Sequence, residues 1–84
     1  MFYVYLIKNE LKDLYYGSTN DLKRRIFEHN NDKSFSTKYH AWKLVYYEAY
    51  FSEKDARERE KMLKQYGQTL AHLKRRLKNS LSES

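Results

Sequence analysis

The sequence predicts an α+β fold: a small, mainly antiparallel three-stranded sheet flanked by three helices, in the order β-β-α-β-α-α. Aromatic and β-branched runs predict the strands, and leucines at helical spacing predict the last helix. The length of 84 residues suits a single domain. A hydrophobic fraction of 40%, with 17% aromatic residues, is too high for a disordered chain.

The first part of the chain is predicted to form a β-hairpin followed by a helix. Phe2–Ile7 is an aromatic and β-branched run typical of a strand, and Asn9 can turn the chain after it. Leu14–Tyr16 is the expected second strand, and Gly17 would allow the turn that closes the hairpin. A polar residue just before residue 21 would cap a helix over about residues 21–30.

The middle of the chain is predicted to add a loop, a long strand and a second helix. A polar loop is expected over residues 31–41, followed by the longest strand over residues 42–51. Ser52 would cap the next helix, with Asp55 in a variant capping box, and that helix would run to about Tyr66.

The last helix is predicted after Gly67, the expected residue beyond the C-terminus of the second helix. Its apolar stripe consists of Leu70, Leu73, Leu77 and Leu81. Residues 80–84 are expected to form a tail, which leaves residues 1–79 as the domain. One core between the sheet and three helices is expected to contain Val4, Leu22, Ile26, Leu44, Val45, Leu63 and Leu73.

The composition excludes several kinds of site. The chain contains no Cys, which excludes disulfides, thiolate catalysis and thiolate zinc sites, and its three His show no metal-ligand spacing. No apolar run approaches the roughly 18 residues of a membrane span. No signal peptide is visible, so a cytoplasmic protein without a membrane partner is expected. The net charge of +6 favours a polyanionic partner.

The predicted first helix carries two polar side chains on its apolar face. At about 100° per residue, Arg25 and His29 share the face of Leu22 and Ile26, which must dock on the sheet. Arg25 can be a snorkelling or ion-paired side chain, since burying a lone guanidinium is costly. The functional alternative is an Arg and a His aimed at an anion in a cleft between helix and sheet.

The second helix repeats this pattern with a carboxylate. Ala56, Glu60 and Leu63 fall on one helical face, so Glu60 lies at the edge of an apolar stripe. Because this helix is rich in both acids and bases, Glu60 can equally be one of many solvated or weakly paired charges. A metal ligand is the functional alternative.

The last helix is rich in cations. Around its leucine stripe stand Lys74, Arg75, Arg76 and Lys78. These side chains form either an ordinary solvated face or a patch that binds nucleic-acid phosphates, which needs only loosely placed cations. From the residues alone both interpretations stay open.

Several segments in a fixed order carry a family resemblance. Tyr3-Val4-Tyr5 and Tyr15-Tyr16-Gly17 stand on the two hairpin strands, Arg25 follows Gly17 by eight residues, and His29 comes four residues later. The later segments are S-T-K-Y from Ser36, W-K-L-V-Y-Y-E from Trp42 and A-R-E-R-E-K-M-L-K from Ala56. Together they resemble the GIY-YIG nuclease superfamily, in its single-domain sub-group similar to the UvrC N-terminal domain, over about residues 2–79. Tyr and Val replace the first two residues of the GIY element, and Tyr replaces the Ile of the YIG element.

The resemblance implies a catalytic site and a metal. Glu60 would bind a single Mg²⁺ or Mn²⁺, since hard cations accept one carboxylate and several waters. Arg25 would hold the scissile phosphate with its planar fork. Tyr5, together with Tyr15, would orient or deprotonate the attacking water. The metal and Arg25 would lower the pKa of the tyrosine hydroxyl for this role. His29 would accept the proton of Tyr5 or contact the phosphate.

The resemblance also implies a metal-dependent endonuclease acting on DNA, structure-selective and related to repair or recombination, with RNA left open as a substrate. One alternative is a non-catalytic nucleic-acid-binding module that uses the same basic cleft. Another is a structural or partner-docking domain. The expected assembly is a monomer or weak homodimer. Because no separate DNA-reading module follows, targeting would come from branched substrates, a partner protein or dimerisation.

Overall fold

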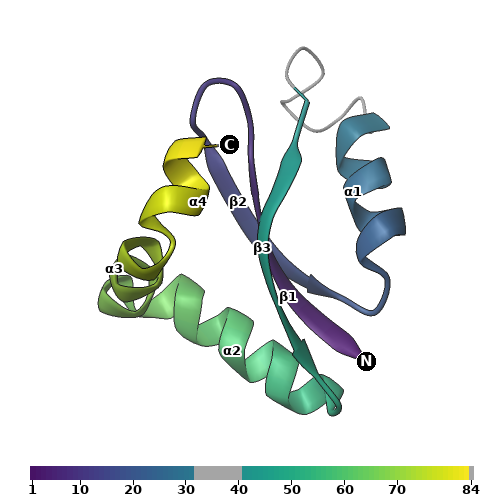
Figure 1. Ribbon diagram of the computed structural model, residues 1–84. Coiled ribbons are helices and arrows are strands. Elements are labelled where there is room, and N and C mark those ends of the chain that lie inside the picture. Colours follow the sequence, from purple (N-terminus) through teal and green to yellow (C-terminus); the bar gives the residue numbers. More distant parts are fainter. Residues whose placement is uncertain (32–40, 84) are drawn as a thin grey trace.

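The computed structural model describes residues 1–31 and 41–83, which form three strands and four helices (Figure 1). In chain order these are β1 (Phe2–Lys8), β2 (Leu14–Thr19), α1 (Leu22–Asn31), β3 (Lys43–Tyr50), α2 (Glu53–Gln65), α3 (Gly67–Arg76) and α4 (Lys78–Glu83). The predicted α+β class and element order are confirmed, except that the expected last helix is divided in two.

The sheet has β1 at its centre, in the order β2-β1-β3, and both pairings are antiparallel. Because side chains alternate along a strand, Val4 and Leu6 face one side of the sheet while Tyr5 and Ile7 face the other. Helix α1 lies on one side of the sheet, and α2, α3 and α4 lie on the opposite side (Figure 1). The sheet therefore has two differently covered faces, and β2 forms one of its edges.

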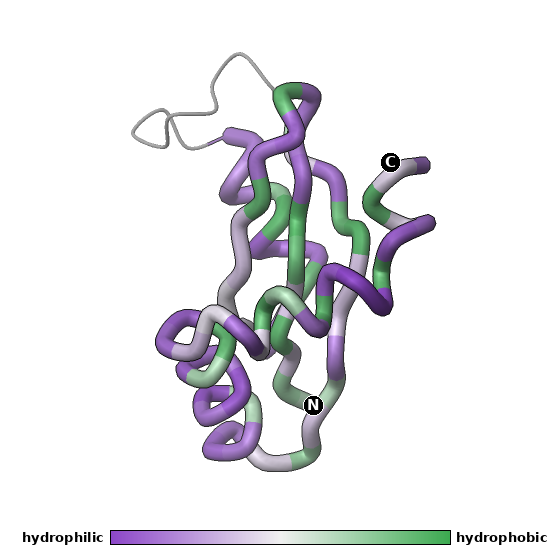
Figure 2. The backbone as a smooth tube through the Cα atoms, turned by 90° about the vertical axis from the view of Figure 1, so that its left-hand side faces the viewer, coloured by the Kyte–Doolittle hydropathy of each residue, from purple (hydrophilic) through white to green (hydrophobic). Residues whose placement is uncertain are grey.

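Two hydrophobic clusters, one on each face, replace the single core that was expected. Between the sheet and helices α2 and α3 lie Val4, Ala56, Leu63 and Leu73. Under α1, Leu22 and Ile26 pack against a buried group made of Tyr5, Ile7 and Trp42. This contact confirms the predicted inner face of α1. The hydrophobic positions run along the strands, while long stretches of the helices are hydrophilic (Figure 2).

A bulge in β3 changes which residues reach each face. Leu6 pairs with Tyr46 and Ile7 pairs with Leu44, so Val45 is an extra residue on β3. Without the bulge, Leu44 would share the face of Tyr46. With it, Leu44 joins the cluster under α1. Val45 is half-buried and belongs to neither cluster, so its expected place in the core was wrong.

Asn9 organises the β1–β2 turn, as predicted. Its Oδ1 accepts hydrogen bonds from the backbone N–H groups of Leu11 and Asp13, each at 3.0 Å. Its carbonyl accepts a third, from the N–H of Lys12 at 3.0 Å. Lys12 has a φ of 67° and is the only described non-glycine residue in the left-handed region. Side-chain bonds from one buried amide thus hold a tight turn in a hairpin without glycine at its tip.

A half-buried carboxylate joins β3 to α2. Glu48 accepts hydrogen bonds from the hydroxyls of Tyr46, at 2.6 Å, and Tyr50, and from the guanidinium of Arg59 at 3.0 to 3.2 Å. Burial raises the pKa of Glu48, but the hydrogen bonds from Arg59 and the tyrosines outweigh burial and hold that pKa below its usual value. Burial and the bond to Glu48 raise the pKa of Tyr46 and of Tyr50 to about 12.

Two helix starts differ in detail from the prediction. Asp21 caps α1, because its Oδ1 accepts a hydrogen bond from the N–H of Arg24 at 3.1 Å. Ser52 occupies the N-cap position of α2, but its side chain makes no capping hydrogen bond. The expected capping box with Asp55 is therefore absent.

The C-terminal part also differs. Gly67 follows the C-cap of α2, as expected, but begins α3 without a positive φ. Leu77 interrupts the expected single helix, and its N–H bonds to the carbonyls of both Leu73 and Lys74. Residues 80–83 belong to α4, where a tail was expected.

The expected S-T-K-Y segment and most of the polar loop lie outside the described residues. Within residues 1–31 and 41–83, no helix is long and apolar enough to cross a membrane.

Candidate active site

The hydroxyl of Tyr5 is the centre of the candidate site. Tyr5 lies on the central strand, and its side chain is 1% exposed. Its Oη lies 2.8 Å from Nε2 of His29 and accepts a hydrogen bond from Nε of Arg25 at 3.3 Å. Both partners come from α1, one turn apart, on the face that the helical spacing predicted. An Arg donor on one side leaves the phenol proton available for an unprotonated Nε2 on the other.

Tyr15 completes this group. The rings of Tyr15 and His29 are 4.8 Å apart between centroids in an edge-on contact, and His29 is 4% exposed. Tyr15 pairs with Ile7 in the β1–β2 register, which places its side chain on the same face as Tyr5. Four of the predicted catalytic residues, Tyr5, Tyr15, Arg25 and His29, thus gather under α1.

The pKa of Tyr5 is raised, in contrast to the expectation that Arg25 would help to lower it. Burial is the largest effect and disfavours the phenolate. The hydrogen bond and charge of Arg25 oppose burial without overcoming it, while the charge of Glu60 adds to the increase in the pKa. The phenol of Tyr5 is therefore protonated at neutral pH.

Gly17 has a different role from the one predicted. It lies inside β2, directly opposite Tyr5, and not at a turn. A Cβ at position 17 would lie 2.8 Å from Tyr5 Oη and 3.1 Å from the ring carbon that bears it. The missing side chain makes room for the Tyr5 hydroxyl.

Glu60 approaches from α2 on the other face of the sheet, at the outer strand. Its Oε1 accepts a hydrogen bond from Ser18 Oγ, and its Oε2 accepts one from Lys64 Nζ, both at 2.6 Å. Burial raises the pKa of Glu60, but its bonds to Lys64 and Ser18 outweigh burial and keep the pKa below its usual value. Ser18 follows Gly17, so the Tyr5 hydroxyl and the Glu60 carboxylate flank consecutive residues of β2. Glu60 is thus near Tyr5, although the two side chains are not bonded.

The donor set around Glu60 suits a hard cation that keeps most of its water. Among the described residues, no three His, Asp or Glu side chains are grouped as a metal site. Glu60 is ionised and only partly buried, and such a carboxylate can bind Mg²⁺ or Mn²⁺ together with waters. The ammonium group of Lys64 already neutralises Oε2, so a metal ion would have to share or displace it.

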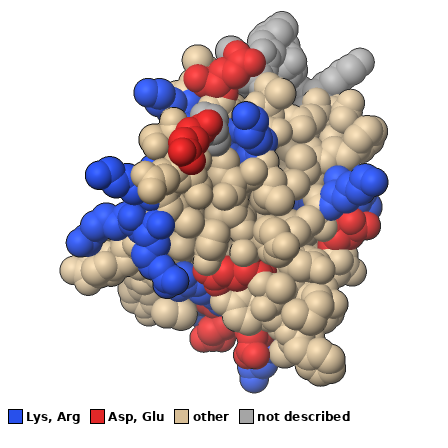
Figure 3. Space-filling view, in the orientation of Figure 1, with Lys and Arg blue, Asp and Glu red and all other residues tan. Residues whose placement is uncertain are grey.

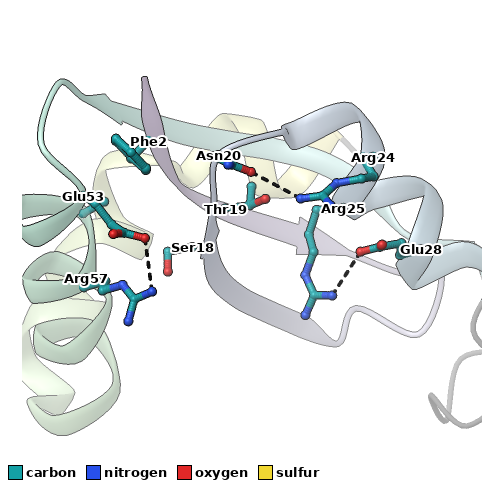
Figure 4. Close-up of a pocket in the computed structure, with 10 residues that line it drawn as sticks. Phe2, Ser18, Thr19, Asn20, Arg24, Arg25, Glu28, Glu53 and Arg57 are labelled. Atoms are coloured by element: carbon teal, nitrogen blue, oxygen red, sulfur yellow. Dashed lines mark hydrogen bonds and ion pairs between the residues drawn. The ribbon is translucent and has the colours of Figure 1, made fainter.

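A pocket of about 320 Å³ spans the space between α1 and α2 beside these residues. Arg25 and Glu28 line it from α1, and Glu53 and Arg57 line it from α2, with Ser18 between them (Figure 4). Sequence reasoning identified Arg25 but missed Ser18 and Arg57. Anionic and cationic groups alternate around this pocket, and Arg25 brings a guanidinium from the Tyr5 group to its wall.

The predicted cationic patch is split. Lys74, Arg75 and Lys78 line a second groove, of about 520 Å³, but Arg76 does not. Arg76 is exposed and influences Tyr46 electrostatically instead. Basic side chains gather along the left side of the molecule, over α3 and α4, in Figure 3. None of the residues that line this groove belongs to the Tyr5 group or to the pocket beside it.

Comparison with known proteins relates the chain to a catalytic domain. The family model described as the GIY-YIG catalytic domain matches residues 1–71. A UPF0213 protein of Clostridium perfringens (strain 13 / Type A) is 38% identical over 66 residues, which cover 76% of this chain and 71% of that protein. No solved structure matches the chain.

Proposed function

Because the chain belongs to the GIY-YIG family of nuclease catalytic domains, we propose that it is a metal-dependent endonuclease that hydrolyses phosphodiester bonds in DNA. The observation that carries this proposal is the Tyr5 hydroxyl, which is bonded to Arg25 and His29. Arg25 lines the pocket between α1 and α2, and so does Ser18, which bonds to Glu60. A structure-selective role in repair or recombination is the biological setting that we propose with it.

Arg25 would bind the scissile phosphate. Its Nε donates to Tyr5 and its Nη1 pairs with Glu28 at 3.3 Å, so the guanidinium is held at the pocket wall. A planar, permanently charged fork matches two phosphate oxygens and stabilises the negative charge that grows on them in the transition state. Glu28 would give way to the phosphate as the substrate binds.

Tyr5 and His29 would activate the attacking water as a relay. A phenol with a raised pKa is a poor base on its own. At 2.8 Å from Nε2 of His29, however, the Tyr5 hydroxyl can pass its proton to the imidazole while it takes one from water. No free phenolate has to form in the buried site. Tyr15 would hold the imidazole ring in place through its edge-on contact.

Glu60 would hold the metal ion, with Ser18 orienting its carboxylate. A bound Mg²⁺ or Mn²⁺ would supply positive charge to the phosphoryl and leaving oxygens. Lys64 keeps the Glu60 carboxylate neutralised until a cation binds, and its flexible stem allows it to move away.

The deciding experiment is a cleavage assay on flap, branched and single-stranded DNA, each with Mg²⁺, with Mn²⁺ and with a chelator. Cleavage that requires the metal is expected, and parallel RNA substrates identify the preferred nucleic acid. Absence of cleavage by the wild-type protein on every substrate would favour the alternative, a non-catalytic nucleic-acid-binding module.

Glu60→Gln separates the two functions more sharply. The substitution keeps the shape of the side chain and removes its charge, so metal-dependent cleavage should be lost while DNA binding stays equal or becomes stronger. Glu58→Gln, an exposed position on the same helix, is the matched control and should retain activity. Equal activity of both variants would remove Glu60 from the mechanism.

A further inference from the structure

The groove beside α3 and α4 collects cations from two distant parts of the sequence. Lys8 and Lys12 come from the β1–β2 hairpin, Lys74 and Arg75 from α3, and Lys78 from α4. The described residues that line this groove of about 520 Å³ include no acidic side chain. The sequence predicts the cationic patch on the last helix alone, because the hairpin comes close to that helix only in the folded chain.

Most of these cationic side chains have no hydrogen-bond or ion-pair partner among the described residues. Lys8 donates a hydrogen bond to the carbonyl of Leu81, which ties α4 to the hairpin. Within residues 1–31 and 41–83, the side chains of the other four, Lys12, Lys74, Arg75 and Lys78, make no hydrogen bond or ion pair. By contrast, Arg57 and Arg59 each pair with a carboxylate. Four unpaired charges around one groove favour an anionic ligand with several charges.

The groove has an apolar floor. Leu14 of β2 and Leu81 of α4 line it together with the cations. Alternating phosphates, sugars and bases match such a surface, because the phosphates need loosely placed cations while sugars and bases can contact apolar side chains.

The position of Leu14 connects the groove to the candidate active site. Leu14 pairs with Lys8, and both lie on the face of the sheet that α2 to α4 cover. Ser18, four residues further along β2, faces the same side and bonds to Glu60. At about 3.4 Å per residue, these two positions on the outer strand are about 14 Å apart. That span equals about four nucleotide steps of 3.4 Å along a duplex.

We propose that the nucleic-acid substrate runs along the outer edge of β2, so that its backbone occupies the groove about four nucleotides from the scissile bond. This proposal rests on the proposed nuclease function and adds a substrate requirement to it. A substrate must extend past the cut on the groove side to be bound tightly, and the groove cations contact its phosphates without reading its sequence.

Direct binding tests the groove independently of catalysis. DNA affinity is measured without metal over a range of salt concentrations, for the wild type and for the triple variant Lys74→Gln, Arg75→Gln, Lys78→Gln. The matched control carries Lys54→Gln, Lys61→Gln and Arg76→Gln, which remove the same charge outside the groove. The groove variant should bind at least tenfold more weakly, with a salt slope reduced by about 0.9 per lost phosphate contact. Equal losses in both variants would overturn the proposal, as would tighter binding of anionic phospholipid vesicles than of DNA through the same residues.

Substrate length tests the placement. DNA is shortened stepwise on either side of the cut, and cleavage by the wild type and by the groove variant is compared. The two proteins should differ severalfold on substrates that extend more than about four nucleotides on one side, and should agree on shorter ones. A constant difference at every length would refute the path along β2. If the wild type cleaves no substrate, the nuclease proposal fails, and the binding measurements alone decide whether the groove holds nucleic acid.

Discussion

The hydroxyl of Tyr5 occupies the space that a side chain at position 17 would need, with only 2.8 Å from Tyr5 Oη to a Cβ built on Gly17. Gly17→Ala must therefore push the ring away from Arg25 and His29, because Tyr5 is buried and bonded to both. We expect cleavage to fall by about 10² or more, in line with losing a positioned transition-state group. Gly67→Ala is the control, since a Cβ there would meet nothing within 4 Å. Similar activity of both variants would contradict the close packing of Tyr5.

Removing the Tyr5 hydroxyl itself tests the relay. Tyr5→Phe keeps the ring and deletes the atom that links Nε of Arg25 to Nε2 of His29. Cleavage should fall severely, and the free energy of unfolding should fall by about 1–3 kcal/mol because a buried polar atom loses its partner. Tyr47 is the residue of β3 that pairs with Tyr5 in the sheet register, and it is 51% exposed, so Tyr47→Phe should leave both quantities nearly unchanged. Single-turnover cleavage and urea unfolding measure the two effects.

Arg25 is expected to act on the transition state. Arg25→Ala should lower the cleavage rate by about 10² or more, whereas the affinity for DNA should change little, because one phosphate contact among several is lost. Lys23→Ala removes a charge from the exposed side of the same helix and serves as the control. A large loss of affinity with an unchanged rate would make Arg25 a binding residue only.

Glu48 should make stability depend on pH in the acid range. Its pKa in the folded state lies below the usual value of a Glu carboxyl, so its stabilising contribution is present above that usual value and is lost as the pH falls through the lower, folded-state pKa. Glu48→Gln should cost about 2 kcal/mol of unfolding free energy near pH 7, because Arg59 and two tyrosines lose a charged acceptor. The difference from the wild type should shrink below about pH 4.

The matched variant Glu53→Gln breaks an exposed i,i+4 pair with Arg57. Such pairs contribute only about 0.3–0.5 kcal/mol. Denaturant unfolding at several pH values distinguishes the two positions. A Glu48→Gln difference that persists unchanged at pH 3 would contradict the ionised network.

Replacing Lys12 should raise the stability of the fold and weaken DNA binding. Its φ of 67° is unfavourable for a residue with a Cβ and free for glycine. Lys12→Gly should therefore raise the unfolding free energy by up to about 1 kcal/mol while it weakens DNA binding through the loss of a groove cation. Lys12→Asn provides a second neutral variant that also tolerates this backbone conformation. Unchanged affinity in both variants would remove Lys12 from the proposed groove.

Local sequence patterns determined the elements and the inward face of α1. Hydrophobic alternation and helical spacing act over a few residues, so Leu22 and Ile26 could be assigned to the sheet, with Arg25 and His29 beside them, before any contact was known. The same locality explains Asn9, whose side chain bonds to backbone groups two and four residues away. The motif spacing also identified the GIY-YIG family, which the match over residues 1–71 confirmed.

Tertiary structure decided everything that depends on strand register and on helix placement. The sequence predicts a turn at Gly17, whereas the strand register places it opposite Tyr5. The sequence predicts Val45 in the core, whereas the bulge in β3 makes it an extra residue. The Ser18–Glu60 bond joins positions 42 residues apart, and the basic groove joins a hairpin to the C-terminal helices. Such contacts have no local signature, because alternation specifies which side a residue faces but not which distant residue meets it there.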